Sequence, residues 1–277
     1  MSANLMNLFK PRITAMLLAS LAVAGLSGCA TAPADPAARA EFEAENDPLE
    51  PMNRAVFAFN LQMDKMFLKP AGIIYRETLP QPVRTGVGNF LSNLRSPVVL
   101  ANDLLQGEME RAGNTAGRFV INTTVGVLGV WDAASHFGIP GHSEDFGQTF
   151  GVWGVGEGFY LVLPIFGPSN PRDTAGLLLE YYVDPFNLWA REENVEGWIF
   201  ARSLVTGIDF RSRNLETLDE IERTSLDYYV AIRSLYRQRR ANEISNGEGT
   251  SDEFAPGISV NPPEKTPAPS DRSANTL

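Results

Sequence analysis

Cysteine, histidine and long apolar runs are scarce in this chain, and each scarcity excludes a class of protein. The 277 residues include one cysteine, so no disulfide can form within the chain. Only two histidines are present, which disfavours a histidine-rich metal site. After Cys29 no stretch reaches the roughly 18 consecutive apolar residues of a membrane-spanning helix. The sequence therefore predicts neither a disulfide-stabilised fold nor a conventional transmembrane helix.

Positive charge is also under-represented. The chain has 23 Lys and Arg residues against 33 Asp and Glu residues, a formal net charge of −10. Residues 1–28 hold two of the cations and none of the anions, so their removal leaves a net charge of about −12. Binding to a phosphate backbone needs a cationic face. Nucleic acid is therefore excluded as the main partner.

The sequence contains no recognisable catalytic motif. It lacks a Gly-x-Ser-x-Gly nucleophile elbow and a His-Glu-x-x-His zinc motif. His142 with Glu144 and Asp145 offers donors for a metal, although a loop turn is the favoured interpretation. The Gly-x-Gly spacing at Gly154 and Gly156 lacks the strand and helix of a dinucleotide site and is interpreted as structural. We therefore predict a protein that is not an enzyme and needs no metal or other cofactor.

The N-terminus has the features of a secretory signal. Lys10 and Arg12 precede an apolar run, residues 13–26, that is too short to span a membrane. The four residues Leu26-Ser27-Gly28-Cys29 resemble the bacterial lipobox, in which the cysteine is acylated and becomes the first residue of the mature chain. An ordinary signal peptide beside an incidental cysteine is the alternative. Position 30 is alanine rather than aspartate, which by the lipoprotein sorting convention indicates the periplasmic side of the outer membrane.

Composition divides the chain into four parts. A signal peptide over residues 1–28 precedes an acylated tether over 29–45, rich in alanine and proline. Residues 46–240 are long enough for one substantial domain. Residues 241–277 include five prolines and few large apolar side chains, so we predict a disordered tail.

The domain is predicted to be mainly helical. Its first helix has Asp47 as N-cap and Pro48 as first residue, and ends at Lys69-Pro70. Residues 125–167 are dense in glycine and aromatics, which favours tight turns and short strands. Further helices are predicted over 82–94, 97–107, 108–124, 170–183 and 217–240, the last opening on a capping box at residues 217–220.

Several of these helices have wide apolar faces rich in methionine and phenylalanine. Such faces pack equally well into a soluble helical core or into a lipid interface. Helical periodicity does not separate the two, so both interpretations stay open.

Several longer motifs occur in order along the domain. The first is Asn46-Asp47-Pro48-Leu49-Glu50-Pro51-Met52-Asn53-Arg54, and the longest covers residues 145–156. The others cover residues 80–86, 102–107, 118–126, 160–164 and 167–169. Together they resemble the MlaA/VacJ family of outer-membrane lipoproteins over roughly residues 46–240.

This resemblance implies a fold and a function. The family fold is a ring of mostly in-plane amphipathic helices around a central amphipathic channel. Members remove phospholipids that stray into the outer leaflet of the outer membrane and pass them to a periplasmic lipid-carrier protein. They associate with trimeric porins. A scaffolding lipoprotein that binds a porin or carrier without conducting lipid is the alternative function, and a lipid hydrolase is disfavoured by the missing nucleophile.

Candidate site residues follow from the resemblance and from residue type. The acylated residue is Cys29. Glycines needed only for folding and phenylalanines of an ordinary core are the alternatives for the two sets that follow. The lipid path is predicted to involve Gly147, Gln148, Thr149, Gly151, Gly154, Val155 and Gly156, and the membrane-facing surface Phe57, Phe59, Phe67 and Phe90.

Overall fold

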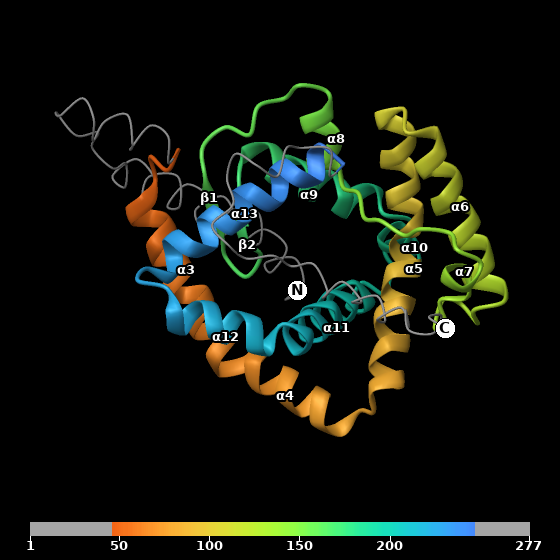
Figure 1. Ribbon diagram of the computed structural model, residues 1–277, viewed down its shortest axis with the longest axis horizontal. Coiled ribbons are helices and arrows are strands. Elements are labelled where there is room, and N and C mark those ends of the chain that lie inside the picture. Colours follow the sequence, from red (N-terminus) through yellow and green to blue (C-terminus); the bar gives the residue numbers. More distant parts are fainter. Residues whose placement is uncertain (1–45, 247–277) are drawn as a thin grey trace, which may run out of the picture.

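The computed structural model describes residues 46–246 (Figure 1). The described chain is mainly helical, which confirms the predicted fold class at that level. Cys29, the predicted signal peptide and tether, and residues 247–277 of the predicted tail lie outside the described residues. The division into four parts therefore stays a prediction.

The first helical segment is longer than predicted. Helix α3 (Glu50–Met63) continues through the π-helical turn η1 (Asp64–Leu68) into α4 (Lys69–Thr78), so the predicted end at Lys69-Pro70 is wrong. Proline has no N–H and its ring crowds the carbonyl four residues earlier. The π turn relieves this conflict because the Lys69 N–H bonds to the carbonyl of Asp64, five residues back.

Two predicted helices form one. Helix α5 (Gln81–Gln106) runs through Pro97, which was expected to begin a new helix. Buried side chains on both sides of the proline, Asn93 and Val98, hold the helix direction through the missing hydrogen bond. The helix ends at Gly107, whose φ of 81° provides the left-handed cap.

The glycine-rich region contains turns and short elements, as its composition indicates. After α6 (Met109–Thr124) come α7 (Ala133–His136) and α8 (Phe146–Val152). Strands β1 (Leu161–Leu163) and β2 (Gly167–Ser169) then pair antiparallel, with Leu161 opposite Ser169.

The remaining chain is helical. Asn170 caps α9 (Pro171–Val183) as predicted, accepting from the Asp173 N–H at 2.8 Å. Helices α10 (Pro185–Glu192) and α11 (Gly197–Arg213) were not predicted. The long helix predicted over 217–240 is two helices, α12 (Leu215–Thr224) and α13 (Tyr228–Ile244). Its predicted capping box lies inside α12, and Asp227 starts α13 by accepting from the Val230 N–H.

Several helices lie along the outline of the view in Figure 1, and α11 runs inside α4 between α12 and α5. Helices α3 and α4 form one side, α5 stands opposite α3, and α6 and α7 lie outside α5. No helix within residues 46–246 combines the length and the apolar character needed to cross a membrane.

A polar network fixes the start of the domain. Asp47 is not the N-cap of α3; its carboxylate lies inside the protein and accepts from Asn53 at 2.7 Å, from Arg233 at 2.9 Å and from the Tyr229 hydroxyl. Asn53 also bonds the Tyr160 carbonyl at 3.0 Å and the Val162 N–H at 2.9 Å. The network thus ties α3 to α13 and β1.

Replacing Asn53 should be strongly destabilising. Asn53→Ala leaves the Val162 N–H and the Tyr160 carbonyl buried without a partner, and each such group costs about 1–3 kcal/mol. We expect the free energy of unfolding to fall by about 3 kcal/mol, measured by thermal unfolding in detergent with circular dichroism. Gln62→Ala, on the exposed side of α3, is the matched control. Equal stability of the two variants would contradict the anchoring role of Asn53.

Candidate functional site

The exterior of the described chain is strongly apolar. Thirty-five large hydrophobic side chains in residues 46–246 are exposed. They include every tryptophan of the chain, at positions 131, 153, 189 and 198. Monomeric soluble proteins rarely expose contiguous apolar patches of more than a few hundred Å². Tryptophan is also the residue most typical of the boundary between lipid and water.

The interior of the described chain is, in contrast, strongly polar. Among the described residues, 20 polar or charged residues are buried against 12 hydrophobic ones. This distribution is the reverse of a soluble domain, in which Asp, Glu and Arg are almost never fully buried. Such burial is tolerable only where each group has a hydrogen-bonding or charged partner. The arrangement suits a protein surrounded by lipid.

The strongest of the buried ion-pair networks centres on Arg240. Its guanidinium binds Asp145 through two hydrogen bonds, of 2.8 and 3.0 Å, and reaches Asp173 at 2.8 Å. These residues belong to α13, to the N-cap of α8 and to α9 respectively. Tyr236 donates a further bond to Asp173 at 2.5 Å. Arg240 therefore holds three helices together.

This network perturbs the carboxylates. Burial by itself raises the pKa of Asp145, but Arg240 and the Gln148 N–H outweigh it and lower that pKa to about 2. Burial likewise opposes ionisation of Asp173, and bonds from Arg240 and Tyr236 bring its pKa below the ordinary value. Both carboxylates thus stay charged inside the protein.

Helices α8 and α9 cross at two glycines. A β-carbon added to Gly176 would lie 2.4 Å from the backbone nitrogen of Gly147. One added to Gly147 would lie 2.6 Å from the Asp173 carboxylate and 2.7 Å from the Arg240 guanidinium. Both positions need glycine because the two backbones approach closely.

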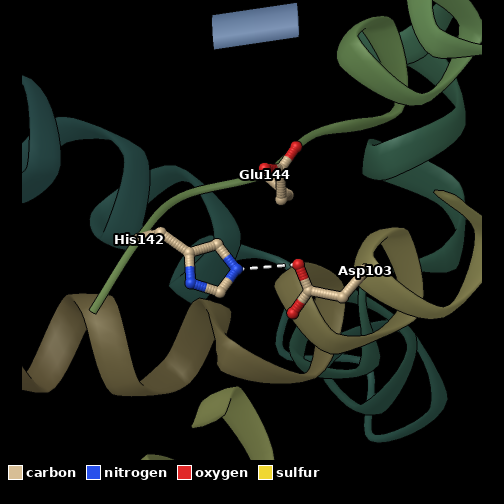
Figure 2. Close-up of side chains that lie close together, drawn as sticks. All are labelled: Asp103, His142 and Glu144. Atoms are coloured by element: carbon tan, nitrogen blue, oxygen red, sulfur yellow. Dashed lines mark hydrogen bonds and ion pairs between the residues drawn. The ribbon is translucent and has the colours of Figure 1, made fainter. Parts of the chain in front are cut away.

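A second polar cluster joins Asp103 on α5 to His142 and Glu144 in the segment before α8 (Figure 2). One ligand atom from each lies within 4.8 Å of the other two, a geometry that can hold a metal ion. His142 Nε2 lies 2.7 Å from Asp103 Oδ1, a contact that Figure 2 draws as a dashed line. Thr115 donates to the other Asp103 oxygen at 2.6 Å.

The Glu144 oxygens that could bind a metal already accept hydrogen bonds from other side chains. The Glu144 carboxylate accepts from Arg111 on one oxygen and from Gln106, at 2.9 Å, on the other. Burial raises the pKa of Glu144, and the bonds from Gln106 and Arg111 oppose this rise. Because a guanidinium shares this site, we assign no metal and interpret the cluster as a tie between α5 and the segment entering α8.

The residues predicted to form the lipid path fall into two groups. Gly147, Gln148 and Thr149 are buried in α8, where the Thr149 hydroxyl donates to Asn102 at 2.7 Å. Gly154, Val155 and Gly156 are exposed in the loop after α8, and Gly151 is half-buried at the end of that helix. Packing accounts for the first group, and a role in a lipid path stays a prediction for the whole set.

The four predicted membrane-facing phenylalanines also divide. Phe59 is 49% exposed and Phe67 56% exposed. Phe57 packs edge-on against Tyr228 and Tyr229, with ring centroids 5.4 and 5.5 Å away. Phe90 is half-buried. Contact with lipid stays a prediction for these side chains, and Phe59 and Phe67 are free to make it.

Sequence reasoning missed part of the apolar exterior. Helices α10 and α11 expose Trp189, Trp198 and Phe200, yet residues 185–216 were assigned no helix. A usable signal was present, since Asp184-Pro185 is an N-cap followed by a proline at the first helical position. The Asp184 side chain accepts from the Phe186 N–H at 2.8 Å.

Replacing Arg240 by a neutral residue should destabilise the α8 region and make its stability less dependent on pH in the acid range. The wild-type pairing stabilises the fold above about pH 4, the ordinary range of an aspartate, and is lost as the pH falls toward the Asp145 pKa of about 2. Arg240→Gln leaves Asp145 without a cation and Asp173 with Arg172 alone, and we expect a loss of about 3 kcal/mol at neutral pH. Thermal unfolding measured between pH 2 and 7 tests this range.

The neighbouring arginine provides the control. Arg239 is largely exposed and pairs only with Glu243 in the contacts that the structure shows, so Arg239→Gln should change stability by less than about 1 kcal/mol. A similar loss in both variants would contradict the central position of Arg240.

Comparisons with known proteins agree on one family. The family model described as MlaA lipoprotein matches residues 45–243. An uncharacterised protein of Rickettsia prowazekii is 36% identical over 198 residues, covering 71% of this chain and 77% of the relative. The intermembrane phospholipid transport system lipoprotein MlaA of Escherichia coli is 32% identical over 242 residues, covering 86% and 90%.

A solved structure agrees with these relatives. It comes from work on the structural basis for maintenance of bacterial outer membrane lipid asymmetry, and it is 32% identical to this chain. It matches with a TM-score of 0.63, over 72% of this chain and 99% of its own. The match over most of the domain confirms the resemblance seen in the sequence motifs. It also agrees with the prediction of a transport lipoprotein rather than an enzyme. This chain belongs to the MlaA lipoprotein family.

Proposed function

We propose that this protein removes mislocalised phospholipids from the outer leaflet of the outer membrane and hands them to a periplasmic lipid carrier, which maintains lipid asymmetry. The observation that carries this proposal is the reversed polarity of the fold: buried charged and polar side chains under an apolar exterior. A chain of the MlaA family with that distribution is built to sit in lipid and to offer polar groups within it.

The apolar exterior would embed the domain in one leaflet. The exposed apolar faces would lie along the membrane, as amphipathic helices do in a lipid interface. Acylation at Cys29 would fix the leaflet and the orientation on the periplasmic side of the outer membrane. Two or more acyl chains at one cysteine anchor stably, whereas one chain alone holds marginally.

The arrangement of helices around the edge of Figure 1 would enclose the lipid path. A phospholipid needs polar groups for its headgroup and an apolar route for its tails. In the loop after α8, Gly154 and Gly156 are exposed on either side of Val155, so backbone and lipid can approach at these two glycines without a side chain between them. The buried residues Gly147 to Thr149 would hold that loop in place.

Transport through this path would be passive. The sequence shows no nucleotide-binding motif, so energy would come from later steps of the pathway. Direction would follow from an excess of phospholipid outside and tighter binding by the carrier within. A trimeric outer-membrane porin would position the protein in the membrane.

Deletion of the gene should raise the phospholipid content of the outer leaflet and the sensitivity of cells to detergent. The measurement is labelling of surface phospholipid in deletion cells and in cells complemented with the wild-type gene. Unchanged surface phospholipid in the deletion would overturn the proposed function.

Cys29→Ala should separate anchoring from folding. Because the described domain makes its own polar and apolar contacts, we expect this variant to leave the outer-membrane fraction while keeping its thermal unfolding midpoint. Membrane fractionation and circular dichroism provide the two readouts. A variant that reaches the outer membrane at the wild-type level would contradict the role of acylation in directing the protein to that membrane.

Photo-crosslinking separates a channel from a scaffold. A photoreactive residue at Val155 should capture phospholipid, because that side chain is 49% exposed in the loop predicted to line the path. The same residue at Glu220, on the exposed side of α12, is the control. Labelling at the control but not at Val155 would favour a scaffolding lipoprotein that conducts no lipid.

A further inference from the structure

The end of α6 and the turn that leads from it toward α7 have no charge over 13 residues. They cover residues 119–131, here called the apolar tip, between Arg118 and Asp132. In Figure 1 this part of the chain lies outside α5, at the edge of the molecule. Large apolar side chains of the tip point outward, namely Val120, Val125, Val127, Leu128, Val130 and Trp131. Val127 and Leu128 are the most exposed of them, at 68% and 62%.

The two charges beside the tip pair with each other. Arg118 donates to Asp132 at 2.8 Å, so one ion pair closes the base of the segment. Arg118 also donates to the Ile139 carbonyl at 2.7 Å. The charged groups therefore mark one boundary of the tip, and the side chains beyond them are uncharged.

The polar side chains of the tip are satisfied from within the protein. Asn122 donates to Asp132 at 2.9 Å and accepts from the Ala134 N–H. The Thr123 hydroxyl accepts from Asn93, and the exposed Thr124 hydroxyl donates to the Val120 carbonyl at 2.7 Å. A hydroxyl that turns back onto its own helix needs no water.

The backbone N–H groups of the turn are satisfied in the same way, with the exception of the Val127 N–H. Six of the seven N–H groups in residues 125–131 donate to carbonyls of residues 121–127, at distances from 2.7 to 3.2 Å. Asn93 also donates to the Leu128 carbonyl. Internal satisfaction of backbone groups is the condition for placing a turn in hydrocarbon.

The turn holds an unfavourable backbone conformation. Val127 has a φ of 53° and Leu128 a φ of 58°, in the left-handed region that a β-branched residue such as valine rarely adopts. A side chain at Gly129 would collide with Asn93, at 2.3 Å. The strain persists because the surrounding hydrogen bonds determine the turn, and its effect is to present two adjacent apolar side chains at the apex.

We propose that the apolar tip inserts into the acyl-chain layer of the membrane, with the pair Arg118–Asp132 at the headgroup level. A protein interface carries about one hydrogen bond per 100–200 Å². The outward side chains at the apex offer no such group, whereas lipid tails require none. This inference depends on the membrane location in the proposed function, but it requires no transport of lipid.

Fluorescence quenching tests the insertion. The full acylated chain with Leu128→Cys carries an environment-sensitive dye in vesicles of phosphatidylethanolamine and phosphatidylglycerol. We expect brominated acyl chains to quench this dye about twofold or more relative to a dye at Glu110→Cys, near the other end of α6. The wild-type chain, whose only cysteine is Cys29, gives the labelling background.

A variant with a charge beside the dye should lose insertion and is the matched comparison. Val127→Asp should abolish the quenching at position 128, because an aspartate is expelled from hydrocarbon. An unchanged circular dichroism spectrum of that variant shows that the helices persist. Quenching that survives Val127→Asp would overturn insertion at the apex.

The remaining outcomes separate this inference from the proposed function. A dye at position 128 with a water-like emission, or a shifted emission without quenching by brominated lipid, would overturn insertion; the second result would indicate a protein partner on the tip. A chain that is quenched but does not lower surface phospholipid in deletion cells would overturn the proposed function alone.

Discussion

The pairing of Arg240 with Asp145 and Asp173 is the interaction on which the domain depends most. One guanidinium bonds a carboxylate at the N-cap of α8 and another in α9, where Arg172 also pairs with Asp173. Its own helix α13 lies almost at the end of the family-matched region. A cation buried without these partners would cost several kcal/mol, so the three helices are stable only together. The crossing at Gly147 and Gly176 brings the partners close enough to bond.

The same rule applies throughout the interior. Where a soluble domain of this size would bury leucine and valine, this one buries Asp47, Asp103 and Arg211, each with a counter-charge or a hydrogen-bond donor. In the proposed membrane location, lipid around the protein would offer no hydrophobic driving force for packing helix on helix. Specific polar contacts therefore take over much of the work of an apolar core. They also explain the first motif, in which Asp47 and Asn53 make contacts with distant elements although the sequence predicted Asp47 to be a helix cap.

The sequence predicted helix ends correctly where neighbouring residues determine them. Asn170-Pro171 and Gly107 fix helix ends through their own backbone bonds and angles, and both were located from the sequence. The predicted helix bounds are wrong where contacts with the rest of the fold determine whether a helix continues. Pro70 was predicted to end a helix and Pro97 to begin one, but a π turn and buried neighbours keep both helices continuous. Asp227 divides the last helix because its side chain caps α13 and binds Arg54, 173 residues earlier in the chain.

The sequence located the segment that contains the predicted lipid path, but not which of its residues are buried and which are exposed. Glycine density and the family motifs identified residues 145–156, yet only the fold shows that Thr149 faces Asn102 inside while Val155 is exposed. Residue type alone does not separate these cases, since a buried glutamine and an exposed valine both break the soluble pattern. When the exterior is apolar, the usual rule that apolar residues are buried and charged residues are exposed no longer applies. An uncharged turn with satisfied backbone groups is then a surface suited to lipid, and a buried charge with its partner is part of the core.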